Sequence, residues 1–376
     1  MAKDMCSPPA WVEIDLKKLD YNFSVLKNLP SARNKKIVAV VKADAYGHGA
    51  LEISRRALAN GAYGLGVARA GEGADLRNQG IECPIYILGD VDQQEADTAL
   101  EYGLTPSISS LEGARLINSR AKTSGKKIGC HINVDTGMNR LGINYACLAP
   151  ALKEIQKLHF LKIEGMFTHF ACASDQTSSL NRKQMHRFGQ AALEAKQILG
   201  PMALVHCANS AAHVGNLPLE ANMVRLGIAM YGLNPFNGPC SVKLLPLLSL
   251  KAKAVLVKKV AKGETISYCG RYRVEKESRI ATFAVGYADG YTRLLSNQAR
   301  IIIGGDYAPV AGNITMDMFM ADVTHIQGVS AGDVATLIGE VNGKSVTAGQ
   351  LAEIIGTINY EVVCMIRARL PKIFIR

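Results

Sequence analysis

The chain of 376 residues is 48% hydrophobic and 20% charged, which predicts a globular protein of two or three domains and excludes a disordered or fibrous chain. The net charge of +11 comes from short basic pairs mixed with acids and aromatic residues make up only 6%, so we expect no nucleic-acid partner. A basic balance of this kind suits an anionic cofactor or a carboxylate substrate.

Short apolar strands alternate with helical patterns between Lys36 and Leu226. The strands are almost continuous apolar runs, as expected where both faces of a parallel sheet are buried. Eight such units within about 190 residues favour a (β/α)8 barrel, with an open doubly wound sheet as the alternative, because a strand count does not prove closure. The predicted strands are Lys36–Val41, Tyr63–Val67, Ile85–Leu88, Thr105–Ile108, Ile128–Val134, Lys162–Phe167, Leu204–Cys207 and Met223–Leu226. The predicted helices are Gly49–Asn60, Gly71–Gln79, Gln93–Tyr102, Ser110–Thr123, Ala149–Leu158, Asn181–Leu199 and Asn209–Val214.

After Tyr231 a loop rich in Asn, Pro and Gly is followed by a mainly strand-like pattern. We therefore predict a barrel domain over 11–241 and a β-rich domain over 242–376, with the first residues of the chain free to pair with the second domain. The predicted strands are Leu248–Val257, Arg279–Ala284, Ala299–Ile303, Met318–Val323 and Val334–Ile338, and one short helix is predicted over Thr347–Gly356.

Neither targeting nor metal signals occur in the chain. No apolar run reaches the roughly 18 to 20 residues of a membrane span, and Met1–Trp11 lacks the apolar core of a signal peptide, so we expect a cytoplasmic protein without a membrane partner. The nine cysteines are odd in number and contain no C-x-x-C pair, which predicts reduced thiols. Without that spacing or an H-E-x-x-H motif, we expect no metal site.

Lys42 is the first candidate for chemistry, because it directly follows the first apolar barrel strand. Active residues of such barrels lie at the carboxyl ends of strands. Desolvation there lowers the pKa of an ammonium group and produces an amine nucleophile that can form a Schiff base. A lysine that merely extends to solvent from a strand end is the alternative. The glycines at 47 and 49 favour a site, because they allow a ligand to approach the backbone.

The seventh and eighth strand ends carry features of a phosphate site. Asn209 and Ser210 are N-cap residue types that open a short helix, whose free N–H groups attract an anion. Gly227 permits close backbone approach after the next strand. Each feature alone is ordinary capping or a turn. Together with a Schiff-base lysine they favour a phosphate-bearing aldehyde cofactor, pyridoxal phosphate.

A set of motifs spread over residues 11 to 376 resembles the alanine racemase family. They are Val41-Lys42-Ala43-Asp44-Ala45-Tyr46-Gly47-His48-Gly49, Val134-Asp135-Thr136-Gly137-Met138, Thr168-His169-Phe170, Ala208-Asn209-Ser210, Val224-Arg225-Leu226-Gly227-Ile228, Val285-Gly286-Tyr287-Ala288-Asp289-Gly290, Thr315-Met316-Asp317, Asn359-Tyr360-Glu361 and Pro371-Lys372-Ile373-Phe374. Single pieces such as Asp-Thr-Gly are weak, whereas the ordered set is specific. The resemblance implies a barrel followed by a β domain, pyridoxal phosphate as cofactor, and interconversion of L- and D-alanine that supplies D-alanine for peptidoglycan.

The resemblance also implies two opposed bases. Lys42 would hold the cofactor and act on one face of the substrate's α-carbon, and Tyr287 would act on the opposite face. A free phenol has a pKa near 10, so Tyr287 needs assistance, which His169 and, through it, Arg225 would supply. Arg225 would face the cofactor's ring nitrogen, and a guanidinium that keeps its proton leaves the ring a weak electron sink, which suits racemisation over transamination.

The remaining site residues follow from the same resemblance. For the cofactor phosphate it names Tyr46, Ser210, Gly227, Ile228 and Tyr360, beside Asn209. It places Arg140 near the cofactor's ring oxygen and the backbone N–H of Met316 on the substrate carboxylate.

Two positions depart from the commonest family pattern. Asn133 stands where the family often has a carbamylated lysine whose negative charge orients Arg140. We expect a small anion, most simply chloride, to replace that charge beside Asn133 and Arg140. Asn313 stands where the entrance to the site usually carries an arginine, which leaves strict alanine preference open.

Three other functional hypotheses remain beside that of an alanine racemase. The first is a pyridoxal-phosphate racemase of broader amino-acid scope, and the second is a decarboxylase, which Arg225 disfavours. The third is a non-catalytic protein that binds pyridoxal phosphate, which would need only the barrel. The resemblance further implies a homodimer in which each β domain caps its partner's barrel, so that active sites are shared between chains.

Overall fold

The computed structural model describes residues 8–217 and 220–376, and these form two compact units. One unit contains residues 19–45 and 49–245, and the other contains residues 8–18, 46–48 and 246–376. Residues 1–7, which make up most of the stretch inspected for a signal peptide, lie outside the described residues. Within the described ranges, no helix combines the length and the apolar character that crossing a bilayer requires.

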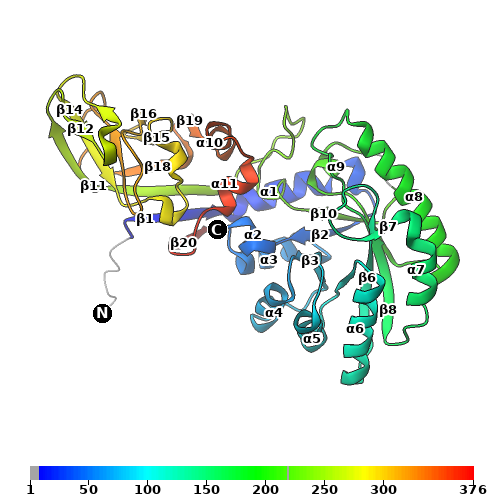
Figure 1. The fold of residues 1–376 in the computed structure, drawn as a ribbon. Helices are drawn as coiled ribbons and strands as arrows, with labels where there is room; N and C mark the ends of the chain where they lie inside the picture. Colours follow the sequence, from blue (N-terminus) through cyan, green and yellow to red (C-terminus); the bar gives the residue numbers. More distant parts are fainter. Residues whose placement is uncertain (1–7, 218–219) are drawn as a thin grey trace. The chain divides into compact units, whose positions relative to one another are not determined.

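Eight parallel strands build the first unit, and they confirm the predicted barrel (Figure 1). They are β2 (Lys36–Val40), β3 (Gly64–Val67), β4 (Ile85–Ile87), β5 (Ser107–Ile108), β6 (Ile128–Asp135), β8 (Leu161–Phe167), β9 (Leu204–His206) and β10 (Met223–Leu226). Strand β10 pairs with β2, so the last strand meets the first. The remaining seam closes where Thr105 forms a parallel bridge with Tyr86 and donates its N–H to the carbonyl of Ile85 at 2.9 Å.

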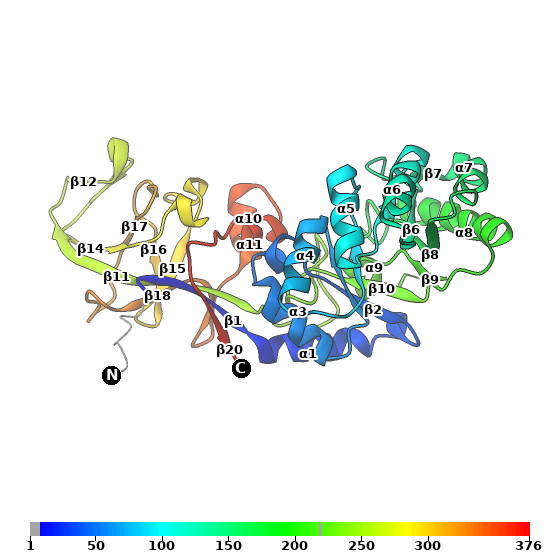
Figure 2. The same ribbon diagram turned by 90° about the horizontal axis from the view of Figure 1, so that it is seen from below.

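The helices follow the strands in alternation and surround the barrel (Figures 1 and 2). They are α1 (Leu16–Lys27), α2 (Lys42–Tyr46), α3 (Ala50–Ala59), α4 (Ala70–Asn78), α5 (Gln93–Tyr102), α6 (Leu111–Ser124), α7 (Leu148–Ile155), α8 (Ser179–Leu199) and α9 (Ser210–Val214). Their ends are set by local chemistry. The side chain of Ser110 caps α6 by accepting from the N–H of Gly113, and Gly125 ends it with a left-handed φ of 67°.

The barrel interior combines an apolar layer with polar side chains near the carboxyl ends of the strands. Val38, Tyr86, Leu204 and Met223 form the apolar cluster. Gly165 on β8 is required there, because an added Cβ would lie 2.3 Å from the carbonyl oxygen of Leu204. The polar residues that follow these strands therefore stand on a packed base rather than over an open pore.

The second unit is mainly β, as predicted, and most of its strand pairs are antiparallel. Its main strands run in the order β16 (Asp306–Pro309), β15 (Arg300–Ile303), β18 (Val334–Val341), β11 (Leu248–Val260), β1 (Ala10–Asp15) and β20 (Lys372–Ile375). Three further strands are attached to this sheet: β14 (Ser278–Phe283), β17 (Phe319–Asp322) and β19 (Lys344–Val346). A separate small sheet consists of β12 (Thr265–Ile266) and β13 (Tyr272–Arg273). The helices of the unit include α10 (Ala348–Ile355) and α11 (Asn359–Cys364). Strand β1, from the start of the chain, lies between β11 and β20.

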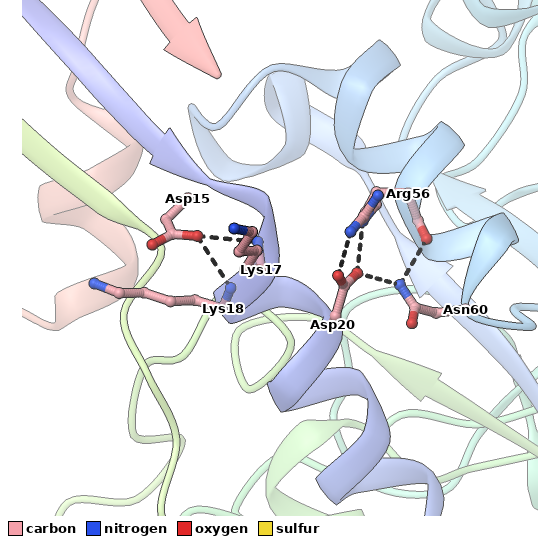
Figure 3. Close-up of polar contacts among 6 residues, drawn as sticks. All are labelled: Asp15, Lys17, Lys18, Asp20, Arg56 and Asn60. Atoms are coloured by element: carbon pink, nitrogen blue, oxygen red, sulfur yellow. Dashed lines mark hydrogen bonds and ion pairs between the residues drawn. The ribbon is translucent and has the colours of Figure 1, made fainter. Parts of the chain in front are cut away.

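An ion-pair cluster joins α1 to α3 on the barrel unit (Figure 3). The carboxylate of Asp20 receives Nε of Arg56 at 2.6 Å together with a second guanidinium hydrogen bond, and Nδ2 of Asn60 donates to it at 2.7 Å. The hydrogen bond from Arg56 is the main cause that lowers the pKa of Asp20. The bidentate geometry fixes the angle between the two helices.

We expect Asp20→Asn to lower the free energy of unfolding by about 0.5 to 1 kcal/mol at neutral pH, because the pair is partly exposed. A carboxylate whose pKa is lowered by folding contributes stability above its unfolded pKa, and this contribution is lost as the pH falls through the folded value. Urea unfolding of the wild type and the variant should therefore differ at pH 7 and converge below about pH 4. Asp75→Asn, on the exposed face of α4, is the matched control. A difference that persists undiminished at low pH would contradict this account.

Candidate active site

Lys42 lies at the carboxyl end of β2, where the sequence predicted it. The strand before it is buried from Ile37 onward, and the N–H of Val41 donates to the carbonyl of Gly66 on β3 at 2.9 Å. The backbone is therefore held by the sheet up to the residue that precedes Lys42. The side chain starts at the rim of the barrel, where low-dielectric surroundings meet the ends of the strands.

The turn after Lys42 has an unusual backbone conformation that the sequence did not predict. Ala43, Asp44, Ala45 and Tyr46 all have φ between 52° and 54°, in the left-handed region. Such a conformation costs about 1 to 2 kcal/mol for each non-glycine residue. Consecutive left-handed residues persist only where outside contacts hold them, and such strain is concentrated at functional sites.

Arg225, on β10, is buried beside the barrel's carboxyl rim with 3% of its surface exposed. Its guanidinium nitrogens lie 2.9 Å from Nδ1 of His206, 3.1 Å from Nδ1 of His169 and 2.9 Å from the carbonyl oxygen of Thr168. A guanidinium can only donate, so both imidazole Nδ1 atoms accept and both rings carry their proton on Nε2. Burial, followed by the charge of Arg225, lowers the pKa of His169 to about 3, so this ring stays neutral.

The proton position on His206 also determines the hydrogen bond between His206 and His131. Nε2 of His206 lies 2.8 Å from Nδ1 of His131, and because the proton of His206 is on Nε2, His206 donates and His131 accepts. Burial lowers the pKa of His131 to about 4 and that of His206 well below its usual value. Neither histidine was predicted from the sequence as part of the site. In the sequence, each is a histidine within a barrel strand, and packing in the barrel interior explains such a residue equally well.

Ser210, Gly227 and Ile228 are brought together after β9 and β10, as predicted. Oγ of Ser210 accepts the N–H of Gly227 at 2.9 Å and that of Ala229 at 3.3 Å. A hydroxyl oxygen accepts at most two hydrogen bonds, so the Ser210 hydroxyl proton is left to donate to a further acceptor. Asn209 caps α9 instead, because its side-chain oxygen accepts the N–H of Ala212 at 3.0 Å.

Asn133 is buried, whereas Arg140 is exposed. Asn133 is 5% exposed and its Nδ2 lies 3.4 Å from Oγ of Ser109. Arg140 is exposed in this chain, although its charge lies close enough to help lower the pKa of His169. Three cations act on His169 at this part of the barrel rim, since the charges of Arg225 and Lys42 also lower its pKa.

The β unit carries Tyr287 and Met316 on two loops that are hydrogen-bonded to each other. The N–H of Tyr287 donates to the carbonyl of Thr315 at 3.1 Å, and the N–H of Ala288 donates to that of Met316 at 3.0 Å. Gly286 is essential to this pairing, because an added Cβ would lie 2.2 Å from the Met316 carbonyl oxygen. The side chains of Tyr287 and Met316 are exposed by 42% and 54%.

Tyr46 and Tyr360 also lie together in this unit, with ring centroids 6.2 Å apart. Burial raises the pKa of Tyr360, so its hydroxyl stays protonated and can donate. Gly47 fixes the approach of the two segments, because an added Cβ would lie 2.5 Å from the carbonyl oxygen of Val363. The predicted site residues thus form two sets, with Lys42, Arg140, His169, Asn209, Ser210, Arg225, Gly227 and Ile228 in the barrel unit and Tyr46, Tyr287, Met316 and Tyr360 in the β unit.

Comparison with known proteins decides the family. Residues 14–235 match the model of the alanine racemase N-terminal domain, and residues 247–374 match that of the C-terminal domain. The chain belongs to the alanine racemase family. A curated alanine racemase of Clostridium novyi (strain NT) is 41% identical over 373 residues, which cover 98% of this chain and 96% of that protein.

Solved structures of the family agree in fold over nearly the full length. An alanine racemase of Clostridium difficile 630 has a TM-score of 0.94 and 36% identity, covering 98% of this chain and 96% of that one. A histidine racemase of Leuconostoc mesenteroides subsp. sake NBRC 102480 has a TM-score of 0.89 and 28% identity, covering 99% of each chain. The fold therefore does not by itself determine which amino acid a member of this group accepts.

The donors of the barrel unit fit pyridoxal phosphate, the cofactor that characterises this family. The hydroxyl proton of Ser210 and the neighbouring backbone of Gly227 and Ile228 suit a phosphate, as does the basic balance of the chain. An amine at Lys42 and a buried guanidinium at Arg225 are the groups that an aldehyde and a ring nitrogen would need. Within residues 8–217 and 220–376, no group of three or more His, Cys, Asp or Glu side chains is placed to hold a metal ion.

Tyr268 is a functional candidate that the sequence analysis missed. Its side chain is 70% exposed, and its neighbours Ser267 and Cys269 have φ of 65° and 63°. Nδ2 of Asn313 donates to the carbonyl of Tyr268 at 2.7 Å, and Oγ of Ser267 donates to the carbonyl of Asn313 at 2.6 Å. An exposed phenol on a strained and anchored turn is typical of a functional position. The only sequence signal was a tyrosine two residues before Gly270 in a turn.

Asn313, expected near the entrance of the site, holds the turn of Tyr268 with a side chain that is 1% exposed. Its effect on substrate choice would therefore be exerted through the position of Tyr268 and not by direct contact with substrate.

Proposed function

We propose that this chain is a cytoplasmic, pyridoxal-phosphate-dependent alanine racemase that interconverts L- and D-alanine and supplies D-alanine for peptidoglycan. Its membership of the alanine racemase family over both domains carries the proposal. The placement of Lys42 at a strand end of the barrel and of Arg225 among neutral histidines supports it.

The cofactor would be held by residues of both units. Lys42 would carry it covalently, Ser210, Gly227 and Ile228 would bind its phosphate with Tyr46 and Tyr360, and Arg225 would donate to its ring nitrogen. Asn209 would act by fixing the start of α9, since its side-chain oxygen is used by the N–H of Ala212. When bound, pyridoxal phosphate supplies an electron-withdrawing ring that stabilises negative charge on the substrate's α-carbon.

Racemisation requires a base on each face of that carbon. The Nζ of Lys42 would remove or return the α-proton on one face, and a phenol of the β unit would do so on the other. Arg225 keeps its own proton, so it would donate a hydrogen bond to the ring nitrogen without protonating it, and negative charge on the α-carbon would be short-lived. A short lifetime favours return of a proton to carbon over other reactions.

The histidine next to Arg225 assists the phenol. His169 is held neutral with its proton on Nε2, because Nδ1 accepts from Arg225. That Nε2–H is available to donate to a phenolate oxygen, and a hydrogen bond to the charged form lowers the pKa of a phenol. The positive charge of Arg225 acts in the same direction through the ring.

Two tyrosines of the β unit are candidates for the phenol. Tyr287 is the residue named from the sequence. The strained backbone on both sides of Tyr268, and the anchoring of its carbonyl by Asn313, favour Tyr268 as the base. Tyr287 would then line the site beside Met316, whose backbone N–H would bind the substrate carboxylate.

We further propose a homodimer in which each barrel is completed by the β unit of its partner. The exposure of Tyr268, Tyr287 and Met316 within a single chain supports this arrangement. Large apolar side chains exposed together are typical of a surface that another protein covers. A two-fold interface makes two equivalent sites.

We expect a chloride ion beside Asn133 and Arg140 in the assembled enzyme. The buried amide of Asn133 can donate to an anion but cannot supply the charge that a carbamylated lysine would. Since Arg140 is exposed in this chain, the site would become closed only in the dimer. Anomalous scattering from crystals grown with bromide in place of chloride should give a peak within hydrogen-bond distance of both side chains. Water alone there, or an acidic residue paired with Arg140, would contradict the prediction.

The range of amino acids that the enzyme accepts distinguishes this function from that of a racemase of broader scope. The similarity to a histidine racemase and the presence of Asn313 favour the broader racemase. The test follows α-proton exchange and loss of optical rotation with L-alanine, L-serine, L-lysine and L-histidine, with Lys42→Ala as the blank. We expect L-alanine to be turned over fastest. Faster turnover of another amino acid would support the broader enzyme, and no turnover of any would leave only a non-catalytic role in binding the cofactor.

A further inference from the structure

The carboxylate of Glu72, on α4, joins the ends of two neighbouring barrel strands. Its Oε1 accepts the N–H of Ala43, directly after Lys42, at 2.7 Å. Its Oε2 accepts the N–H of Ala68 at 2.6 Å and that of Arg69 at 3.2 Å, directly after β3. One side chain thus binds three backbone N–H groups from the loops that follow β2 and β3.

Capping of α4 explains only half of this arrangement. Glu72 is the third residue of the helix, and a glutamate at that position commonly accepts the N–H of the N-cap residue, here Arg69. The bond from Oε1 to Ala43 has no part in capping and reaches across 29 residues of sequence. It is a charge-assisted hydrogen bond, which is shorter and stronger than one between neutral groups.

The bond to Ala43 lies at the start of the strained left-handed turn. Ala43 has φ 53° and ψ 51° and begins the left-handed turn. Further along the turn, the N–H of Gly49 donates to the carbonyl of Asp44, and the N–H of Ala50 donates to its carboxylate. Glu72 ties the start of the turn to a different helix of the barrel.

We propose that Glu72 is a positioning residue for Lys42, which holds the peptide after Lys42 in the left-handed turn and thereby sets the direction of the lysine side chain. This inference rests on the proposed function, in which Lys42 carries the cofactor. Glu72 itself touches neither substrate nor cofactor in this account. Its effect is exerted through the peptide unit that links Lys42 to Ala43.

Glu72→Gln leaves the side chain able to accept only one of its two sets of hydrogen bonds. An amide keeps one acceptor oxygen and gains an NH2 group, so it can serve either the N–H of Ala43 or those of Ala68 and Arg69, but not both. Glu72→Ala removes both and serves as the second variant. Asp75→Asn makes the same carboxylate-to-amide change one turn later, on the exposed face of α4, and is the matched control.

Three readouts are measured on full-length protein. The first is the rate of amide hydrogen exchange over residues 41–46 without cofactor. The second is the rate at which pyridoxal phosphate becomes attached to Lys42, measured by borohydride reduction and peptide mapping. The third is the pair of values kcat and KM for L-alanine. For Glu72→Ala, which removes the hydrogen bond to Ala43, we expect amide exchange to become about tenfold faster or more, cofactor attachment to become about tenfold slower or more, and kcat to fall by about tenfold or more with a smaller change in KM, because small misplacements of a reacting group have large effects on rate. For Glu72→Gln, which keeps one of the two sets of hydrogen bonds, we expect smaller changes in the same directions. Asp75→Asn should match the wild type.

The outcomes separate this inference from the proposed function. If both Glu72 variants fold as judged by their unfolding transitions, and residues 41–46 exchange and Lys42 reacts as in the wild type, Glu72 has only a capping role and the inference is wrong. If a variant is too unstable to assay, the other decides by the same criteria, and loss of folding in both contradicts a specific positioning role. If reduction of the wild type labels a lysine other than Lys42, the proposed function itself fails.

Discussion

A Lys42→Ala variant is expected to lose alanine racemase activity by about 10⁴-fold or more, because in the proposed function this one residue both carries the cofactor and serves as a base. Borohydride reduction of the wild type followed by peptide mapping should place the pyridoxyl group on Lys42, and the variant should carry none. Lys126→Ala, in the exposed turn after α6, is the control and should retain full activity. Label on a different lysine of the wild type would mean that the barrel strand registration, and not only the role of this residue, is wrong.

The second large effect is expected for Tyr268→Phe, which removes the proposed opposing base. We expect racemisation to fall by about 10²- to 10⁴-fold, the usual contribution of a general acid–base group. Because Lys42 still faces one side of the α-carbon, the variant should continue to exchange the α-proton of one enantiomer of alanine with solvent while exchange of the other is lost. This asymmetry separates loss of a base from general damage to the site.

Tyr287→Phe is the comparison that decides between the two tyrosines. With Tyr268 as the base, Tyr287→Phe should retain exchange with both enantiomers and lose less activity than Tyr268→Phe. The reverse result, with one-sided exchange in Tyr287→Phe and two-sided exchange in Tyr268→Phe, would restore the assignment made from the sequence. In either case the phenol belongs to the β unit.

The barrel could be predicted from the sequence because its strands are buried on both faces. Most of the eight are short, mainly apolar runs and the first seven are each followed by a helix, and the helix Gln93–Tyr102 was predicted to the residue. Strand β1 was missed as an element, although Ala10–Asp15 alternates buried and half-buried residues in the manner of a strand. Its partners, β11 and β20, lie more than two hundred residues away, and no local pattern identifies them.

The site was predictable in its residue types but not in its backbone or proton positions. Alanine has no preference for the left-handed region, so the turn at Ala43 and Ala45 follows only from the contacts around it. The tautomers of His131 and His206 depend on which nitrogen faces Arg225, and this requires the folded barrel. Tyr268 was overlooked for a similar reason, since its exposure and the strain beside it are properties of the folded turn.

Sharing of one active site between two chains is the central claim of this account, and subunit mixing tests it most directly. Lys42→Ala and Tyr268→Phe proteins, each inactive alone, are combined in equal amounts under conditions that allow exchange, with Lys42→Ala and Tyr287→Phe as a parallel pair. In a mixed dimer one site receives both defects and the other receives none, so random exchange should restore about a quarter of wild-type activity. If each site were built within a single chain, every site would carry one defect. No activity would then return after confirmed exchange, and the shared site would be disproved.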